Sequence, residues 1–126
     1  MGEVLIVDDD DAAREALRGM VEAAGYPAVA FGNPVGALAR IAEHRPALIL
    51  LDMMMPQVDG ADFLARLVRL HEGGTIPVIV VSAMGYLMHG MPGGQVHAAG
   101  VREVLTKPVR YATLVDAVRR IIGPPD

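Results

Sequence analysis

The chain has 126 residues, which allows one domain of ordinary size and excludes a second. It contains no cysteine, so disulfide frameworks, thiolate zinc sites and cysteine nucleophiles are excluded. The 15 acidic and 11 basic residues give a formal net charge of -4, which argues against direct nucleic-acid binding.

Five short apolar runs, each four or five residues long, predict β-strands. Runs of this length that are rich in branched side chains are typical of strands buried on both faces of a parallel sheet. In chain order they are Val4–Val7, Ala28–Phe31, Ala47–Leu51, Pro77–Val81 and Glu103–Thr106, of which the last is the least apolar.

Helical patterns lie between these runs. An apolar stripe with helical spacing predicts a helix over about 12–24, capped by Asp10 or Asp11 and ended by Gly25. The pair Asn33 and Pro34 is typical of a helix start, and this second helix should run to about His44. Similar stripes predict helices around 63–70 and 114–122. A fourth helix should be short and begin near residue 92 or later, because the stretch 85–94 holds four glycines, each about 1 kcal/mol worse than alanine in a helix.

Strands that alternate with helices predict βαβ units with right-handed crossovers. We therefore expect an α/β fold with a doubly wound, five-stranded parallel sheet and helices on both faces. Residues 1–123 should form this domain, and residues 124–126 should be a C-terminal tail or the start of a linker. No segment approaches the roughly 18 consecutive apolar residues of a membrane span, and the N-terminus lacks the basic start of a secretory signal. The expected location is cytoplasmic, without membrane contact.

Polar residues follow the predicted strands at their carboxyl ends, where open parallel sheets bind their ligands. Asp8 and Asp9 follow the first strand and Asp52 follows the third. Ser82 follows the fourth, and Lys107, the only lysine of the chain, follows the fifth. Clustered carboxylates repel one another by several kcal/mol and need a cation, and a few oxygen ligands with open positions suit Mg²⁺. A carboxylate nucleophile beside a lysine and a hydroxyl predicts phosphoryl transfer to an aspartate.

Four fragments, in this order, make the sequence resemble the receiver domain of bacterial two-component response regulators. They are VLIVDDD, LILLDMMMPQVDG, VIVVSA and VLTKP, and together they extend over nearly the whole chain. The resemblance implies a flavodoxin-like sheet with strand order 2-1-3-4-5. It also implies a signalling phosphoacceptor that takes its phosphoryl group from a histidine kinase or phosphotransfer protein and then switches its binding to an output domain or effector, with homodimerisation on activation as a further possibility. Such a protein is not an enzyme in the ordinary sense, because it catalyses only its own phosphorylation and dephosphorylation.

The same resemblance assigns roles to individual residues. Asp52 is the phosphoacceptor, and Mg²⁺ is held by Asp9, Asp52 and the backbone carbonyl of Met54, with Asp8 acting through water. Ser82 and Lys107 hold the phosphoryl oxygens.

The sequence departs from the family pattern at positions that pass the signal on to a partner. Val104 stands where the family often has an aromatic switch residue, and Val109 where phenylalanine often follows Lys-Pro. The interval from Ser82 to Gly100 is a few positions longer than usual. We therefore expect phosphorylation to act through Ser82 by ordering residues 84–97.

Two alternatives remain at the level of sequence. In a haloacid-dehalogenase-type phosphatase, Asp8 would be the nucleophile and Asp10 the acid/base, but Ala12 is atypical, the downstream acidic motif is absent and the chain is short for that fold. An inactive receiver-like interaction module is the other, although such modules usually lose an acidic residue or the lysine, and this chain keeps both.

Overall fold

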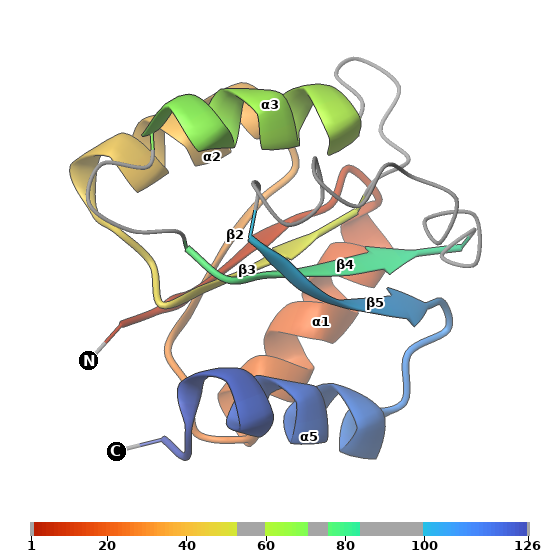
Figure 1. The fold of residues 1–126 in the computed structure, drawn as a ribbon. Helices are drawn as coiled ribbons and strands as arrows, with labels where there is room; N and C mark the ends of the chain where they lie inside the picture. Colours follow the sequence, from red (N-terminus) through yellow and green to blue (C-terminus); the bar gives the residue numbers. More distant parts are fainter. Residues whose placement is uncertain (1, 53–59, 71–75, 84–99, 126) are drawn as a thin grey trace.

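The computed structural model describes residues 2–52, 60–70, 76–83 and 100–125. In these ranges the chain forms five strands and four helices (Figure 1). In chain order they are β1 (Val4–Val7), α1 (Asp11–Ala23), β2 (Ala28–Phe31), α2 (Pro34–Glu43), β3 (Leu48–Leu51), α3 (Gly60–Leu70), β4 (Val78–Ser82), β5 (Val101–Thr106) and α5 (Tyr111–Ile122). The predicted fourth helix and the predicted ordering of residues 84–97 concern residues outside the described ranges, so both stay predictions.

All five strands are parallel, as the sequence pattern predicts, and follow the order β2-β1-β3-β4-β5, as the resemblance to receiver domains implies. The strand β1 pairs with β2 on one side and β3 on the other, with Val4 opposite Ala28 and Leu48. The strand order therefore reverses between β1 and β3. Open parallel sheets place their ligand sites at such a reversal.

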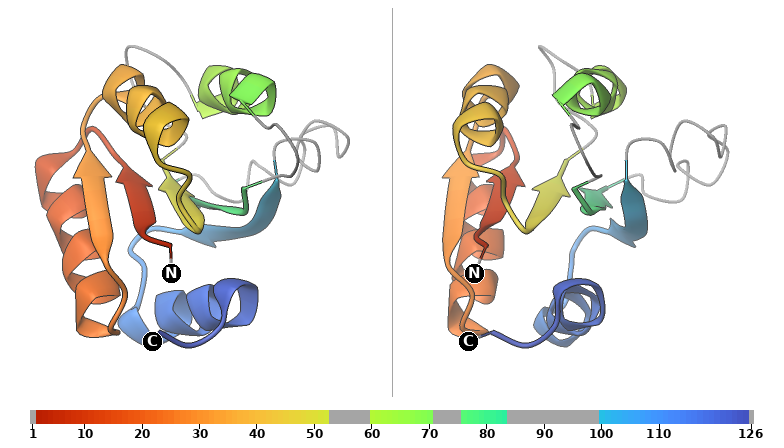
Figure 2. Two further views of the ribbon diagram at one scale, coloured as in Figure 1. Left: turned by 90° about the vertical axis from the view of Figure 1, so that its left-hand side faces the viewer. Right: turned by 60° about the vertical axis from the view of Figure 1, so that its left-hand side comes forward.

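Helices cover both faces of the sheet. Figures 1 and 2 show α2 and α3 on one face, and α1 and α5 on the other. Because successive side chains of a strand point to opposite faces, β1 contributes to two separate cores. Leu5 and Val7 pack in the cluster that holds Phe63 of α3, whereas Val4 and Ile6 pack in the cluster that holds Leu17 of α1. Among the described helices, none is both long and apolar enough to cross a lipid bilayer.

The outer strands differ from the prediction that every strand is buried on both faces. All residues of β1, β3 and β4 are buried, but all four residues of β2 are only half-buried, and β5 has buried, half-buried and exposed positions. The reason is their position, because β2 and β5 are the edges of the sheet and have a neighbouring strand on one side only. An apolar run in the sequence does not distinguish a central strand from an edge strand.

Local capping signals place the start of α1 next to the first strand. Asp10, and not Asp11, is the N-cap, and its side chain accepts a hydrogen bond from the backbone N–H of Ala13. Gly25 follows the helix with a positive φ of 99°, which an L side chain rarely adopts. Asn33 caps α2 as predicted, by accepting from the N–H of Val35. The cap at Asp10 leaves Asp8 and Asp9 in the short loop between β1 and α1.

Candidate functional site

Backbone hydrogen bonds of the sheet continue past the strand ends and fix two of the predicted site residues. The N–H of Asp8 donates to the carbonyl of Phe31 over 3.1 Å, and the N–H of Asp52 donates to the carbonyl of Val7 over 2.9 Å. The backbone of both aspartates is therefore held by the sheet at its carboxyl edge. The two residues lie on either side of the point where the strand order reverses.

Three carboxylates meet at this edge. One oxygen from each of Asp8, Asp9 and Asp52 lies within 4.8 Å of the others. Asp8 is completely buried and Asp52 is 5% exposed, whereas Asp9 is exposed to solvent. Two unit charges about 4 Å apart interact by roughly 4 kcal/mol at an effective dielectric constant of 20. Such a cluster is stable only with positive charge nearby.

Lys107 supplies part of that charge. Its Nζ lies 2.8 Å from Oδ2 of Asp8 and 3.6 Å from Oδ2 of Asp52. Burial by itself lowers the pKa of Lys107, but the hydrogen bond to Asp8 and the charges of Asp8 and Asp52 outweigh it, so the pKa lies above the ordinary lysine value. The ammonium therefore stays protonated at neutral pH and balances one of the three negative charges.

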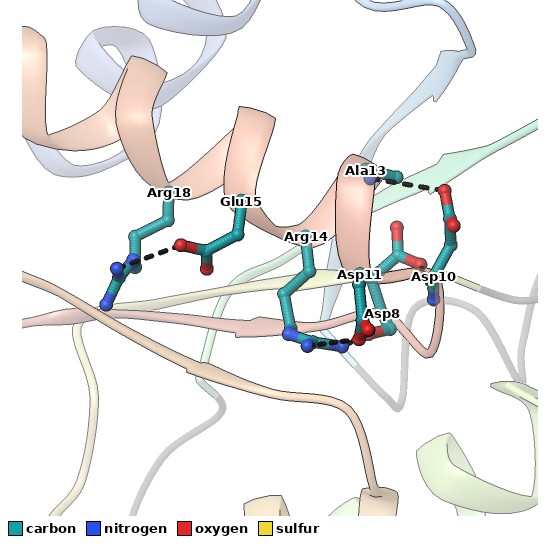
Figure 3. A network of polar contacts seen from close by, with 7 residues as sticks. All are labelled: Asp8, Asp10, Asp11, Ala13, Arg14, Glu15 and Arg18. Atoms are coloured by element: carbon teal, nitrogen blue, oxygen red, sulfur yellow. Dashed lines mark hydrogen bonds and ion pairs between the residues drawn. The ribbon is translucent and has the colours of Figure 1, made fainter.

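Asp8 also makes one contact within its own loop and one with helix α1. Its Oδ1 accepts a hydrogen bond from the N–H of Asp10 over 3.0 Å, and its backbone carbonyl accepts one from Nη1 of Arg14 over 3.0 Å (Figure 3). No sequence motif marks Arg14 as a residue of the site. Its only local signal is a carboxylate three positions earlier, at Asp11, which indicates an ordinary ion pair on the helix surface.

Ser82 is the last residue of β4 and is 1% exposed. Its backbone carbonyl accepts a hydrogen bond from the N–H of Lys107 over 2.9 Å, so the two residues lie side by side at the sheet edge. The structure thus brings Asp8, Asp9 and Asp52 together with Lys107, and it places Ser82 next to the lysine. Met54 lies outside the described residues.

The donor set fits a hard divalent cation. Three carboxylate oxygens converge, and one of the three side chains, that of Asp9, reaches solvent. Oxygen ligands of an octahedral ion with bonds of ~2.1 Å lie about 3 to 4 Å apart, which is close to the observed separation. The three carboxylates are therefore grouped closely enough to hold a metal ion.

A groove of about 390 Å³, lined mainly by apolar side chains, lies beside the lysine. It is lined by residues of α1, including Leu17 and Met20, and by Val81, Lys107, Pro108 and Val109. Val104 is half-buried and packs against the core on the α2 and α3 side of the sheet. Its side chain is therefore not part of this groove.

Comparison with known proteins agrees with this geometry. The family model "Response regulator receiver domain" matches residues 4–119. The chain is 31% identical over 120 residues to the polar-differentiation response regulator DivK of Brucella anthropi, covering 95% of each chain. It is 36% identical over 126 residues to the phosphate regulon transcriptional regulatory protein PhoB of Pseudomonas aeruginosa, covering 98% of this chain and 54% of PhoB. It therefore spans nearly all of DivK but only about half of PhoB.

Solved structures share the fold. A sensor protein from Polaromonas sp. JS666 superposes with a TM-score of 0.84 at 25% identity, over 96% of this chain and 95% of that one. The family match sets aside the haloacid-dehalogenase alternative, and the pocket of Asp8, Asp9 and Asp52 is typical of a phosphoacceptor site. This chain therefore belongs to the response regulator receiver domain family, whose members are signalling phosphoacceptors and not classical enzymes.

Proposed function

We propose that Asp52 is the phosphoacceptor of this receiver domain. Its position carries the proposal, because it directly follows the central strand β3, lies 3.6 Å from the Lys107 ammonium and shares the pocket with Asp8 and Asp9. Asp8 is the weaker candidate. It has no exposed surface, and both of its carboxylate oxygens already accept hydrogen bonds, one from Asp10 and one from Lys107.

In the proposed reaction a carboxylate oxygen of Asp52 forms a bond to phosphorus while the bond from phosphorus to the donor atom breaks. The donor group leaves with the electron pair of that bond. Lys107 and Ser82 then contact the phosphoryl oxygens, since both lie at the same edge of the sheet. Their charge and hydroxyl group stabilise the negative charge that the phosphoryl group carries.

We propose Mg²⁺ as the metal ion, with Asp9 and Asp52 as direct ligands, the Met54 carbonyl as a third, and Asp8 bound through water. The burial of Asp8 and its two hydrogen bonds support the indirect role, and the exposure of Asp9 supports the direct one. Bound Mg²⁺ neutralises charge on the transferring phosphoryl group and on the carboxylates.

Receiver domains interact with kinases and with output domains. We propose a histidine kinase or phosphotransfer protein as the donor here, and an output domain or effector as the recipient of the signal. A donor must approach Asp52 closely, because the side chain is only 6% exposed, and the apolar groove next to Lys107 offers contact surface at that edge.

We further propose that the receiver domain comprises residues 1–123 and that 124–126 are a tail or the start of a linker. The hydroxyl of Tyr26 donates to the carbonyl of Gly123 over 2.7 Å, which supports including Gly123 in the domain.

Incubation with acetyl phosphate and Mg²⁺, followed by intact mass measurement, tests the assignment. We expect one added phosphoryl group on the wild type and on Asp10→Asn, and none on Asp52→Asn. Equal labelling of Asp52→Asn would overturn the assignment, and labelling mapped to Asp8 would favour phosphatase-type chemistry. A wild type that is not labelled at all would favour the inactive module.

A further inference from the structure

Arg14 makes two contacts with the loop that carries the proposed metal ligands. Its Nη1 donates to the backbone carbonyl of Asp8 over 3.0 Å, and its Nη2 forms an ion pair with Oδ1 of Asp11 (Figure 3). The side chain is only 19% exposed, although Arg14 lies in the first turn of a surface helix. Arg18, one turn later, is 44% exposed and pairs with Glu15 on its own helix.

Gly32 provides the space for this guanidinium. A Cβ atom built on Gly32 would lie 2.6 Å from Nη1 of Arg14 and 3.3 Å from its Cζ. The guanidinium therefore lies directly against the backbone of the loop between β2 and α2. Since the crowded atoms form the far end of a flexible side chain, an alanine at position 32 would displace Arg14 and not the fold. Gly32 does not have a positive φ, so its replacement adds no backbone strain.

Two hydrogen bonds hold the backbone on either side of Asp9, and the Arg14 contact is one of them. The carbonyl that Arg14 holds belongs to the peptide group between Asp8 and Asp9. The N–H of Asp10, which belongs to the next peptide group, donates to Oδ1 of Asp8 over 3.0 Å. The peptide groups before and after Asp9 are thus both held by hydrogen bonds, although the side chain of Asp9 is exposed. Arg14 provides one of these two restraints.

We propose that Arg14 is a positioning residue of the metal site: it holds the peptide group before Asp9, and Gly32 and Asp11 hold Arg14 in place. The inference rests on the proposed function, because it assumes that Asp9 is a direct ligand of Mg²⁺. Groups that orient ligands without touching the ion commonly change metal affinity by 10 to 100-fold when they are removed.

A positioning role and the positive charge of Arg14 have opposite effects on Mg²⁺ affinity. The direction in which the Mg²⁺ dissociation constant changes therefore tests the proposal. The positive charge of Arg14 repels a cation, so its removal on Coulomb grounds alone would tighten Mg²⁺ binding. Loss of positioning would weaken Mg²⁺ binding, because Asp9 must then be ordered when the ion binds. A purely structural arginine would lower thermal stability and leave the Mg²⁺ dissociation constant of the folded protein unchanged.

The experiment is a titration with MgCl₂ alone, followed by backbone amide NMR shifts, on the wild type and four variants. Arg14→Ala removes the contact and the charge, Arg14→Lys keeps the charge but not the two-nitrogen contact, and Gly32→Ala displaces the guanidinium and keeps every charge. Arg18→Ala is the matched control, because it removes one positive charge from the same helix without touching the loop.

We expect Arg14→Ala and Gly32→Ala to raise the Mg²⁺ dissociation constant roughly 10-fold, Arg14→Lys to raise it severalfold, and Arg18→Ala to leave it unchanged or slightly lower. An unchanged or lower constant in Gly32→Ala would overturn the proposal, as would an equal rise in Arg18→Ala. If Arg14→Ala does not fold, Gly32→Ala decides alone. A wild type that does not bind Mg²⁺ would instead overturn the proposed metal site, and the positioning role with it.

Discussion

Lys107 donates a hydrogen bond to Asp8 over 2.8 Å, and the two residues are 99 positions apart in the chain. This contact is shorter than the 3.6 Å separation between the ammonium and Asp52. The carboxylate of Asp8 is completely buried, so the lysine is its counter-charge inside the domain. Lys107 and a bound divalent cation thus neutralise the same acidic pocket, and removal of one should increase the effect of the other.

Replacement of Lys107 by methionine should lower the free energy of unfolding of the metal-free domain by roughly 1 to 3 kcal/mol, because a buried carboxylate loses its charged partner. Mg²⁺ should then stabilise the variant more than it stabilises the wild type, by linkage. Urea unfolding with EDTA and with MgCl₂ measures both effects. Equal stability of the two proteins in EDTA would show that the ion pair contributes nothing.

The same pair predicts a pH dependence at alkaline pH. The pKa of Lys107 is raised in the folded state, so the stabilisation is complete below the unfolded-state pKa of about 10.4 and is lost as the pH rises through the higher folded-state value. The difference in unfolding free energy between wild type and Lys107→Met should be constant from about pH 7 to 9 and shrink above about pH 10.4. The other titrating groups occur in both proteins, so their contributions to the unfolding free energy cancel in this difference. A difference that grows at high pH would mean that the fold favours the neutral amine.

Asp9→Asn should separate metal binding from folding. Asp9 is exposed, and its charge adds to the repulsion in the pocket, so the metal-free variant should be as stable as the wild type or slightly more stable. The stabilisation that MgCl₂ gives to the wild type should be lost. Thermal melts with and without MgCl₂ check this. Undiminished stabilisation by Mg²⁺ in the variant would place the ion elsewhere.

Tyr26→Phe tests a contact at the opposite end of the sheet. The tyrosine is 3% exposed, and its hydroxyl donates to the carbonyl of Gly123 over 2.7 Å. Loss of this hydrogen bond should lower the free energy of unfolding by about 1 kcal/mol and leave Mg²⁺ affinity unchanged. Tyr111→Phe is the control, because Tyr111 is 46% exposed, and it should have little effect in the same urea titration. A change in Mg²⁺ affinity in Tyr26→Phe would show that the two ends of the sheet are coupled.

The sequence by itself determined the fold class and the membership of the acidic pocket. Apolar patterning and helix capping, which depend only on neighbouring residues, are sufficient to predict these features. The apolar runs at 4–7, 47–51 and 77–81 predict the three central strands to within one residue, and the caps at Asp10 and Asn33 with the glycine at position 25 set the ends of the helices. A parallel sheet then brings the residues after its strands to one edge, whatever their separation in the chain. Asp8, Asp9, Asp52 and Lys107 could therefore be identified together from the sequence.

Only the tertiary structure decided which groups in that pocket touch. The preference of Lys107 for Asp8 over Asp52 depends on distances of 2.8 and 3.6 Å between side chains that come from different loops. The role of Arg14 depends on the packing of two loops, because its partner is a backbone carbonyl and its space comes from the missing side chain of Gly32. Every residue has a backbone carbonyl, and the sequence shows the glycine at position 32 without showing which side chain occupies the space beside it. Periodicity and spacing report which residues share an edge or a face, whereas contacts between loops arise only when the chain is packed.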